Sequence, residues 1–291
     1  MMCSVKTCVV LLFTIGVVSV QAGQVLAEDP AATPLNVSFV RDIVPILTKS
    51  GCNAGPCHAK AGGGPNGFQL SLLGFEPAED YENLVLEGNG RRIFPAAIEH
   101  SLILRKATGQ VSHVGGVRIE AGSPNYLKIA QWIEQGMPYQ QPNEPELERM
   151  EVIPAKMMLQ PNAQVQLQAL AHYSDGTSRD VTSLALYESN AVAMLQVDPS
   201  GAVVASDLPG RAAVMVRFQG KTAVMSASIP LGAELGVFPA NRNFIDEHVF
   251  NNLRELGLPP SPICDDGTFL RRVTLDIAGR LPSEREATEF L

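Results

Sequence analysis

Cysteine is scarce in this chain, and its distribution limits the chemistry. Only five of the 291 residues are cysteine, and two of them, Cys3 and Cys8, lie close to the N-terminus. The other three, Cys52, Cys57 and Cys264, form one close pair and one singleton. A small secreted scaffold held together by disulfides would need more cysteines than this. The sequence therefore argues against a disulfide framework.

Basic clusters and catalytic signatures are also missing. The formal net charge is -8, from 30 acidic and 22 basic residues, and no run of lysine and arginine resembles a nucleic-acid footprint. No Ser/His/Asp set, no paired carboxylates with a pocket and no phosphate-binding loop can be read from the residues. These absences argue against nucleic acid as a partner and against hydrolysis as an activity.

The chain also lacks an apolar run of the ~20 residues that a membrane-spanning helix needs. Its N-terminal apolar run, 9–20, follows Lys6 and precedes two small-x-small patterns that end at Ala22 and Ala27. This order is typical of a cleaved secretory signal peptide. We expect residues 1–27 to be removed and the mature protein to be exported to the periplasm or cell surface, with peripheral membrane contact or none.

The most informative residues that are present are Cys52, Cys57 and His58, in the order Cys-x4-Cys-His. In an exported protein this order is typical of covalent haem attachment, in which the thiols bond the vinyl groups and the imidazole binds the iron. The usual spacer has two residues, and the sequence does not decide whether four permit attachment. Gly55 would let the longer loop fold so that both sulfurs reach the ring.

Two other chemistries stay open for the same residues. A disulfide between Cys52 and Cys57 would suit an oxidising compartment and would leave His58 as an ordinary surface residue. A zinc ion would need two cysteines and two histidines, and the adjacent Cys57 and His58 do not easily face one tetrahedral ion. We favour haem, with one haem c in each chain and His58 as the proximal iron ligand.

A second axial ligand would have to come from the chain opposite His58. His113 is the leading candidate because it lies in a loop before the helix that is expected to begin at Ser123 and to close the first domain. Glycines next to His113 allow close approach to a flat ring. Met137 falls after that helix, His100 precedes an apolar run, and an iron without a second protein ligand is the remaining alternative. Histidine on both faces would favour a low potential and electron transfer.

The hydrophobic period changes twice along the chain. Over 38–138 the apolar residues recur with the spacing of a helix, and helices are expected to begin at Ser38 and Ser123. Over 152–230 every second residue is apolar, which predicts strands over 165–173 and 191–197 among others. After Pro239 the helical spacing returns. We therefore predict a multidomain protein with an all-α first domain, an all-β sandwich and an α-helical C-terminal segment.

Three stretches resemble parts of one kind of large exported protein. The first stretch, 37–139, resembles a planctomycete-type cytochrome c domain through GCNAGPCHAKAGG and SLILRKATGQVSHVGGVRI. The second, 152–205, resembles a bacterial Ig-like domain of group 2 through VIPAKMMLQPNAQVQLQALAHYSDG. The third, 243–291, resembles the start of an uncharacterised C-terminal domain through LRRVTLDIAGRLPS. The resemblance implies a signal peptide at 1–27, a haem domain at 36–140, an Ig-like domain at 150–231 and part of a helical domain at 240–291.

These observations predict an exported c-type cytochrome-like protein that binds one haem covalently through Cys52, Cys57 and His58 and transfers single electrons. His113 is its candidate distal ligand, and the Ig-like module is a spacer or adhesion module. The alternative is a haem-free interaction protein of the cell surface, with a Cys52 to Cys57 disulfide and a sandwich that binds a glycan or protein. In both cases a non-enzymatic role is favoured, and the redox partner is unknown.

Overall fold

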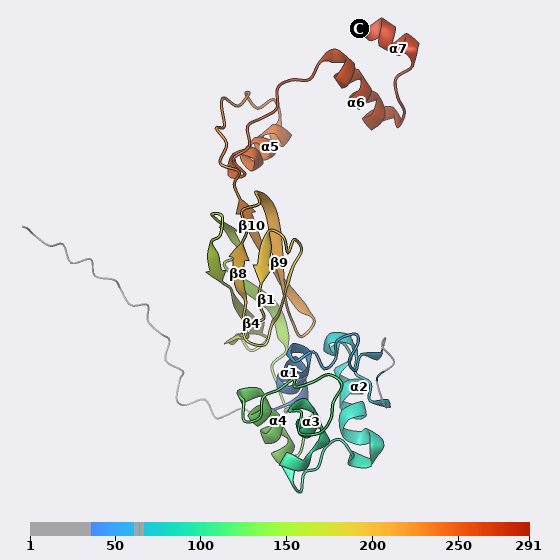
Figure 1. Cartoon of the computed structure of the whole chain (residues 1–291), viewed down its shortest axis with the longest axis vertical. Helices are drawn as coiled ribbons and strands as arrows, with labels where there is room; N and C mark the ends of the chain where they lie inside the picture. The colour runs from blue at the N-terminus through green and yellow to red at the C-terminus, as the bar shows by residue number, and fades with distance from the viewer. Residues whose placement is uncertain (1–35, 61–63, 65–66) are drawn as a thin grey trace, which may run out of the picture. The chain divides into compact units, whose positions relative to one another are not determined.

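The structure is a computed structural model that describes residues 36–60, 64 and 67–291 (Figure 1). The predicted signal peptide, 1–27, lies outside the described residues. The described part belongs to one compact unit, and it contains two separate hydrophobic cores, one formed by residues of 37–133 and one by residues of 150–229. Within the described part, no helix combines the length and apolar character required to cross a membrane.

The first core is enclosed by short helices joined by long loops. The helical elements are η1 (Phe39–Ile43), α1 (Val44–Lys49), η4 (Leu72–Gly74), α2 (Pro77–Tyr81), η5 (Glu82–Leu86), η6 (Glu87–Gly90), η7 (Ile98–His100), α3 (Leu102–Ala107) and α4 (Pro124–Glu134). One isolated parallel bridge joins Ala59 to Leu70. The predicted helical character is confirmed, whereas the assignment of these short helices to a cytochrome c fold stays a prediction.

The helix boundaries follow from local capping. The Ser38 hydroxyl accepts a hydrogen bond from the Arg41 backbone N–H at 3.2 Å, and the Ser123 hydroxyl accepts one from the Tyr126 N–H at 3.3 Å. Each cap satisfies a backbone donor that the first turn of a helix leaves unpaired. After α4, Gly136 has φ of 82°, a left-handed conformation that stops the helix at little cost for glycine.

The first and last of these helices pack on each other. The ring of Phe39 in η1 lies 5.5 Å from that of Trp132 in α4, and both side chains are fully buried. The Trp132 indole N–H donates to the Pro138 carbonyl at 3.1 Å, and the Phe39 backbone N–H donates to the same carbonyl at 3.0 Å. The burial of two large aromatic rings thus ties the two ends of this part together.

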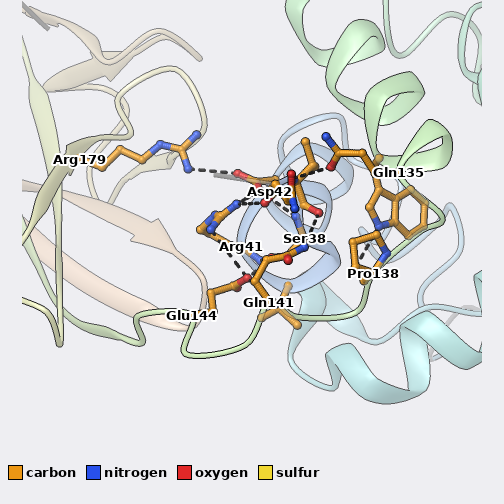
Figure 2. Close-up of polar contacts among 12 residues, drawn as sticks. Ser38, Arg41, Asp42, Gln135, Pro138, Gln141, Glu144 and Arg179 are labelled. Carbon is orange, nitrogen blue, oxygen red and sulfur yellow. Dashed lines mark hydrogen bonds and ion pairs between the residues drawn. The ribbon is translucent and has the colours of Figure 1, made fainter. Parts of the chain in front are cut away.

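A buried ion cluster lies beside this aromatic contact (Figure 2). The Asp42 carboxylate accepts hydrogen bonds from the Arg41 guanidinium at 2.7 Å and from the Ser38 backbone N–H at 3.0 Å. Glu144 is 3.8 Å from Arg41, and Arg179 of the β-sheet part reaches Asp42 at 3.2 Å. Burial raises the pKa of Asp42, but these hydrogen bonds and positive charges together outweigh it, and the net shift is downward.

The second core is enclosed by three sheets. Their strands are β1 (Leu147–Ile153), β2 (Lys156–Met158), β3 (Gln164–Gln166), β4 (Gln168–Tyr173), β5 (Ser178–Asp180), β6 (Leu186–Ser189), β7 (Leu195–Val197), β8 (Ala202–Ala205), β9 (Gly210–Phe218) and β10 (Lys221–Ile229). The strand orders are β1-β4-β5, β2-β10-β9-β6 and β3-β8-β7, and the pairs are antiparallel except β2 with β10. Buried residues alternate along β9, as the period of two predicts.

Two predicted strands differ from the observed ones. The run 165–173 is divided at Leu167, whose backbone N–H donates to the Gly201 carbonyl at 2.9 Å, so that β3 and β4 belong to different sheets. The strand predicted over 191–197 begins only at Leu195, because the backbone N–H groups of Met194 and Leu195 both donate to the Ala191 carbonyl and form a turn. Periodicity alone does not reveal such local hydrogen bonds.

The C-terminal segment is α-helical, as predicted, and it forms three helices. These are α5 (Phe244–Glu255), α6 (Asp266–Ala278) and α7 (Glu284–Phe290). The helix α6 ends at Gly279, which has φ of 65°, and α7 begins with a capping box between Ser283 and Glu286. No residue of these helices is buried, and their apolar side chains are exposed or partly exposed. The coarse prediction of helical and β-sheet parts in one chain is thus confirmed.

Candidate cofactor site

The cysteine motif forms a closed loop directly after α1. The backbone N–H of Cys52 donates to the last turn of the helix, at Leu47, and the N–H of His58 returns to the Cys52 carbonyl at 3.0 Å. A turn within the spacer, from the Cys57 N–H to the Ala54 carbonyl at 3.1 Å, takes up the intervening residues. The four-residue spacer therefore brings the two ends of the motif together through backbone hydrogen bonds.

The ring of His58 is held from several sides. Its Nδ1 lies 3.1 Å from the Phe68 carbonyl oxygen, and its ring centroid is 4.7 Å from that of Phe68. The Leu70 N–H donates to the His58 carbonyl at 2.7 Å, next to the bridge between Ala59 and Leu70. When Nδ1–H donates to a carbonyl, the lone pair is left on Nε2, which is the tautomer that a metal ligand needs.

The surroundings of His58 favour its neutral form. Burial is the largest effect that lowers the pKa of His58, and the positive charges of His113, Lys106 and Arg92 act in the same direction. The hydrogen bond to the Phe68 carbonyl opposes them without reversing the shift. A neutral imidazole is the form that binds a metal ion.

The structure brings His113 to the same place. The two imidazole rings are 6.0 Å apart between centroids, with an angle of 6° between their planes. The Nδ1 of His113 lies 3.2 Å from the Gly116 carbonyl oxygen, which again leaves Nε2 as the nitrogen with the lone pair. Gly115 leaves room for this ring, because a Cβ atom there would lie 2.9 Å from Cε1 of His113.

The spacing of these rings can be compared with that required by a shared metal ion. A metal–imidazole bond is about 2 Å long, and the ring centroid lies about 1.1 Å further on, so two imidazoles on opposite sides of one ion have centroids about 6.2 Å apart. The observed centroid separation of 6.0 Å is close to this value, but the two rings are stacked face to face, whereas opposite ligands of one ion point their ring nitrogens at each other. Within the described residues there is no cluster of three or more His, Cys, Asp and Glu side chains suited to a metal ion.

The two motif thiols have different surroundings. Both are free in the structure, so the predicted haem attachment and the alternative disulfide both stay predictions. Burial raises the pKa of Cys52 to about 11, and the neighbouring Cys57 adds to this shift. The Arg118 guanidinium lies 3.7 Å from the Cys57 sulfur and opposes the rise at Cys52. Cys52 is therefore a protonated and weakly reactive thiol at neutral pH.

The rival distal ligands lie in other surroundings. Met137 packs against the helical core, its backbone N–H donates to the Trp132 carbonyl at 2.9 Å, and its carbonyl accepts from the Tyr81 hydroxyl at 2.7 Å. The side chain of His100 is exposed and lies 3.6 Å from Glu99. Of the three candidates, His113 is the one whose ring contacts that of His58.

Sequence reasoning missed two residues of the site, Phe68 and Arg118. Phe68 supplies both a carbonyl and a ring to His58, and the Arg92 guanidinium lies over the Phe68 ring, 4.7 Å from its centroid. Arg118 contacts Cys57. The short spacing between His113 and Arg118 was the only signal in the sequence for Arg118, and nothing in the sequence pointed to Phe68.

Comparison with known proteins gives a family for the C-terminal helices. A family model described as "Protein of unknown function (DUF1549)", with the short name PSCyt2, matches residues 244–291, which include α5, α6 and α7. This match supports the predicted resemblance for that stretch and does not include the candidate site. No curated protein matches the chain.

One similar solved structure is a crystal structure of the S-layer protein rSbsC. The identity is 12%, the match covers 42% of this chain and 18% of that one, and the TM-score is 0.26. The chain thus spans less than a fifth of the length of that protein. A likeness of this size carries no argument about fold or function.

Proposed function

We propose that the protein is an exported, c-type cytochrome-like electron carrier that holds one haem covalently. Cys52 and Cys57 bond the haem, His58 is the proximal ligand of its iron and His113 is the distal ligand. The observation that supports this proposal best is that the fold brings the rings of His58 and His113 together, with their centroids 6.0 Å apart. The donor set also fits, since two thiols and two imidazoles are the groups that such a haem needs.

A bound haem would supply one-electron oxidation and reduction, and two histidine ligands would keep its potential low. The residues of the chain supply the rest. If Nδ1–H of His58 and His113 donates to the Phe68 and Gly116 carbonyls, Nε2 of each ring would carry the lone pair that could bind the iron. The motif loop, closed by its backbone hydrogen bonds, holds the two cysteines beside His58.

The other parts of the chain have supporting roles in this proposal. The β-sheet part is an Ig-like spacer or adhesion module, and the protein acts in the periplasm or at the cell surface after its signal peptide is removed. The name PSCyt2 of the matched family agrees with a cytochrome role, although that family is described as having no known function. The redox partner is a protein or small carrier that is not identified.

Covalent attachment is tested by the intact mass of the mature chain after co-expression with a haem-maturation system. We expect an increase of one haem that survives denaturation in the wild type and in Cys264→Ser, which removes the cysteine outside the motif. The Cys52→Ser, Cys57→Ser double variant should lose it. A wild type without added mass, and with a Cys52 to Cys57 disulfide in its peptide map, would refute the proposal.

Axial ligation is tested by absorption spectra of the loaded protein. His113→Ala should convert a low-spin ferric spectrum to a high-spin one, because the iron loses its second strong-field ligand. His100→Ala is the matched control, since it removes an exposed histidine, and its spectrum should equal that of the wild type. An unchanged spectrum in His113→Ala would remove His113 from the site.

A further inference from the structure

A cavity of about 340 Å³ lies where residues of the helical part and of the β-sheet part meet. Its lining includes Phe75 of the helical part, several residues of the connecting segment 140–147, and Tyr173 and Gln219 of the β-sheet part. No residue of the cysteine motif, 52–58, lines it. Ligand cavities in proteins commonly have volumes of ~300–1,000 Å³ and often form between structural units. This cavity therefore has the size and the place of a binding site.

Two buried polar atoms of the lining lack a hydrogen-bond partner among the described residues. The Arg41 side chain is 9% exposed, and its Nη1 forms no hydrogen bond. Its other nitrogens are used, because Nε and Nη2 donate to Asp42 at 3.1 and 2.7 Å and Nη2 also donates to the Asn36 carbonyl. The buried Tyr173 hydroxyl likewise has no partner within hydrogen-bonding distance. Because an unpaired buried group costs free energy, each of these atoms would gain from pairing with a ligand.

The charges around Arg41 favour an uncharged ligand. Glu144 is 6% exposed and lies 3.8 Å from Nη1 of Arg41, which is too far for a hydrogen bond (Figure 2). Glu146 also lines the cavity, and among the described residues of the lining Arg41 is the only cation. An anion would therefore meet two carboxylates, and a cation would meet the guanidinium. A hydroxyl group suits both, since it can accept from Nη1 and donate to a carboxylate.

An exposed aromatic ring borders the same cavity. Phe75 is 82% exposed, although it lies directly after η4, which packs against α1. Gly74 allows this packing, because it has φ of 74° and a Cβ atom there would clash with the Val44 side chain. The face of an exposed aromatic ring offers a flat apolar surface to a ligand. The cavity thus combines a flat apolar platform with buried groups that pair with hydroxyls.

A second cavity, of about 440 Å³, shares Phe75 and Gln219 with the first. Its lining is largely apolar and includes Leu72, Leu184 and Leu186. None of its described residues carries a buried polar atom without a partner. It therefore has no comparable group to orient a polar ligand, and the cavity of 340 Å³ is the stronger candidate.

From these groups we propose that the cavity of 340 Å³ binds an uncharged saccharide. One sugar hydroxyl accepts a hydrogen bond from Nη1 of Arg41, a second pairs with the Tyr173 hydroxyl, and an apolar face of the sugar ring packs on Phe75. The site needs residues of both parts of the chain, so it differs from a glycan site on the sandwich alone. It also shares no residue with the proposed haem site, and it does not depend on that proposal.

The experiment titrates the ¹⁵N-labelled mature chain with cellobiose, maltose and N,N′-diacetylchitobiose and follows the backbone amides by nuclear magnetic resonance. We expect at least one of these disaccharides to shift the amides of Gly74, Phe75 and Gly220, with a dissociation constant in the millimolar range or below. Glucuronate should bind more weakly than glucose. The inference is overturned if no disaccharide shifts these amides, if the shifts lie only outside the cavity, or if glucuronate binds more tightly than glucose.

The aromatic platform is tested by Phe75→Ala. The exposed ring contributes little to the core, so the variant should stay folded while its affinity for the disaccharide falls about tenfold. Phe94→Ala is the matched control, since Phe94 is also an exposed ring of the helical part, at 51%, but does not line the cavity. Equal affinities for the two variants would contradict the role of Phe75.

The unpaired hydroxyl is tested by Tyr173→Phe. The affinity should fall about fivefold through the lost hydrogen bond, whereas the melting temperature of the free protein should not fall, because the hydroxyl has no partner to lose. Tyr187→Phe is the control for stability, since the Tyr187 hydroxyl donates to the Thr182 carbonyl at 3.0 Å and its loss should lower the melting temperature. Wild-type affinity in Tyr173→Phe would contradict the place of Tyr173 in the site.

Discussion

The imidazole ring of His113 fits in its position because the residues beside it are glycines. Gly115 faces the ring, and a Cβ at this position would lie 2.9 Å from Cε1 of His113 and 3.4 Å from Nε of Arg118. The carbonyl of Gly116 then fixes the ring through Nδ1. The glycines were visible in the sequence as residues that allow close approach, but their specific contact with the imidazole ring depends on the fold of the loop.

Gly115→Ala should therefore disturb axial ligation without removing a ligand. We expect a mixture of low-spin and high-spin ferric spectra in the loaded protein, because the new methyl group pushes the His113 ring from its place. Gly267→Ala is the control, since Gly267 lies in α6, outside the site, and a Cβ there would meet only the flexible Asp265 carboxylate, at 3.3 Å. Equal spectra for the two variants would contradict this role of Gly115.

The buried carboxylate of Asp42 gives a prediction about stability. Asp42→Asn should destabilise the helical part by about 3 kcal/mol at pH 7, because it leaves the buried Arg41 guanidinium without the partner that it contacts at 2.7 Å. Guanidinium chloride unfolding measures this difference. Asp207→Asn, which changes an exposed aspartate, should alter stability by less than about 0.5 kcal/mol.

The same pair predicts a pH dependence. The pKa of Asp42 is lower in the folded protein than in the unfolded chain, where it is about 3.9, so its stabilisation is present above that value and is lost as the pH falls below it. The difference between the wild type and Asp42→Asn should therefore shrink below about pH 4. A difference that is constant between pH 7 and pH 3 would show that the carboxylate charge does not stabilise the fold.

At the scale of elements, the sequence predicted the helix boundaries well and the strands less well. The caps predicted at Ser38 and Ser123 are local, because the capping hydroxyl and the N–H that it satisfies lie three residues apart. The division at Leu167 is not local, since it depends on a hydrogen bond to Gly201, 34 residues further on. Signals in sequence report the first kind of contact and not the second.

The β-sheet core should respond to the loss of one large side chain. Leu167 is fully buried among residues of all three sheets, so Leu167→Ala should destabilise this part by about 2–5 kcal/mol through lost burial and a residual cavity. Val192→Ala, which shortens an exposed side chain, should change stability by less than about 0.5 kcal/mol. Thermal unfolding followed by circular dichroism compares the two variants, and equal stabilities would contradict the assignment of Leu167 to the core.

At the scale of the whole molecule, the described chain combines a helical part, a β-sheet part and three exposed C-terminal helices. The residues from Cys52 to His58 could be predicted as a cofactor site from their order in an exported chain, and His113 as its second ligand from its place before α4; both stay predictions. Phe68 could not be identified, because its contact with His58 arises from the short parallel bridge between Ala59 and Leu70. Pairings of this kind appear only when the chain is folded.

We propose that His58 and His113 would hold one haem iron through their Nε2 atoms, and electron paramagnetic resonance of the ferric loaded protein tests this most directly. Two imidazoles whose planes differ by only 6° should give a low-spin signal of rhombic shape, with three resolved features. A high-spin signal, or the single highly anisotropic low-spin feature of perpendicular imidazole planes, would contradict it.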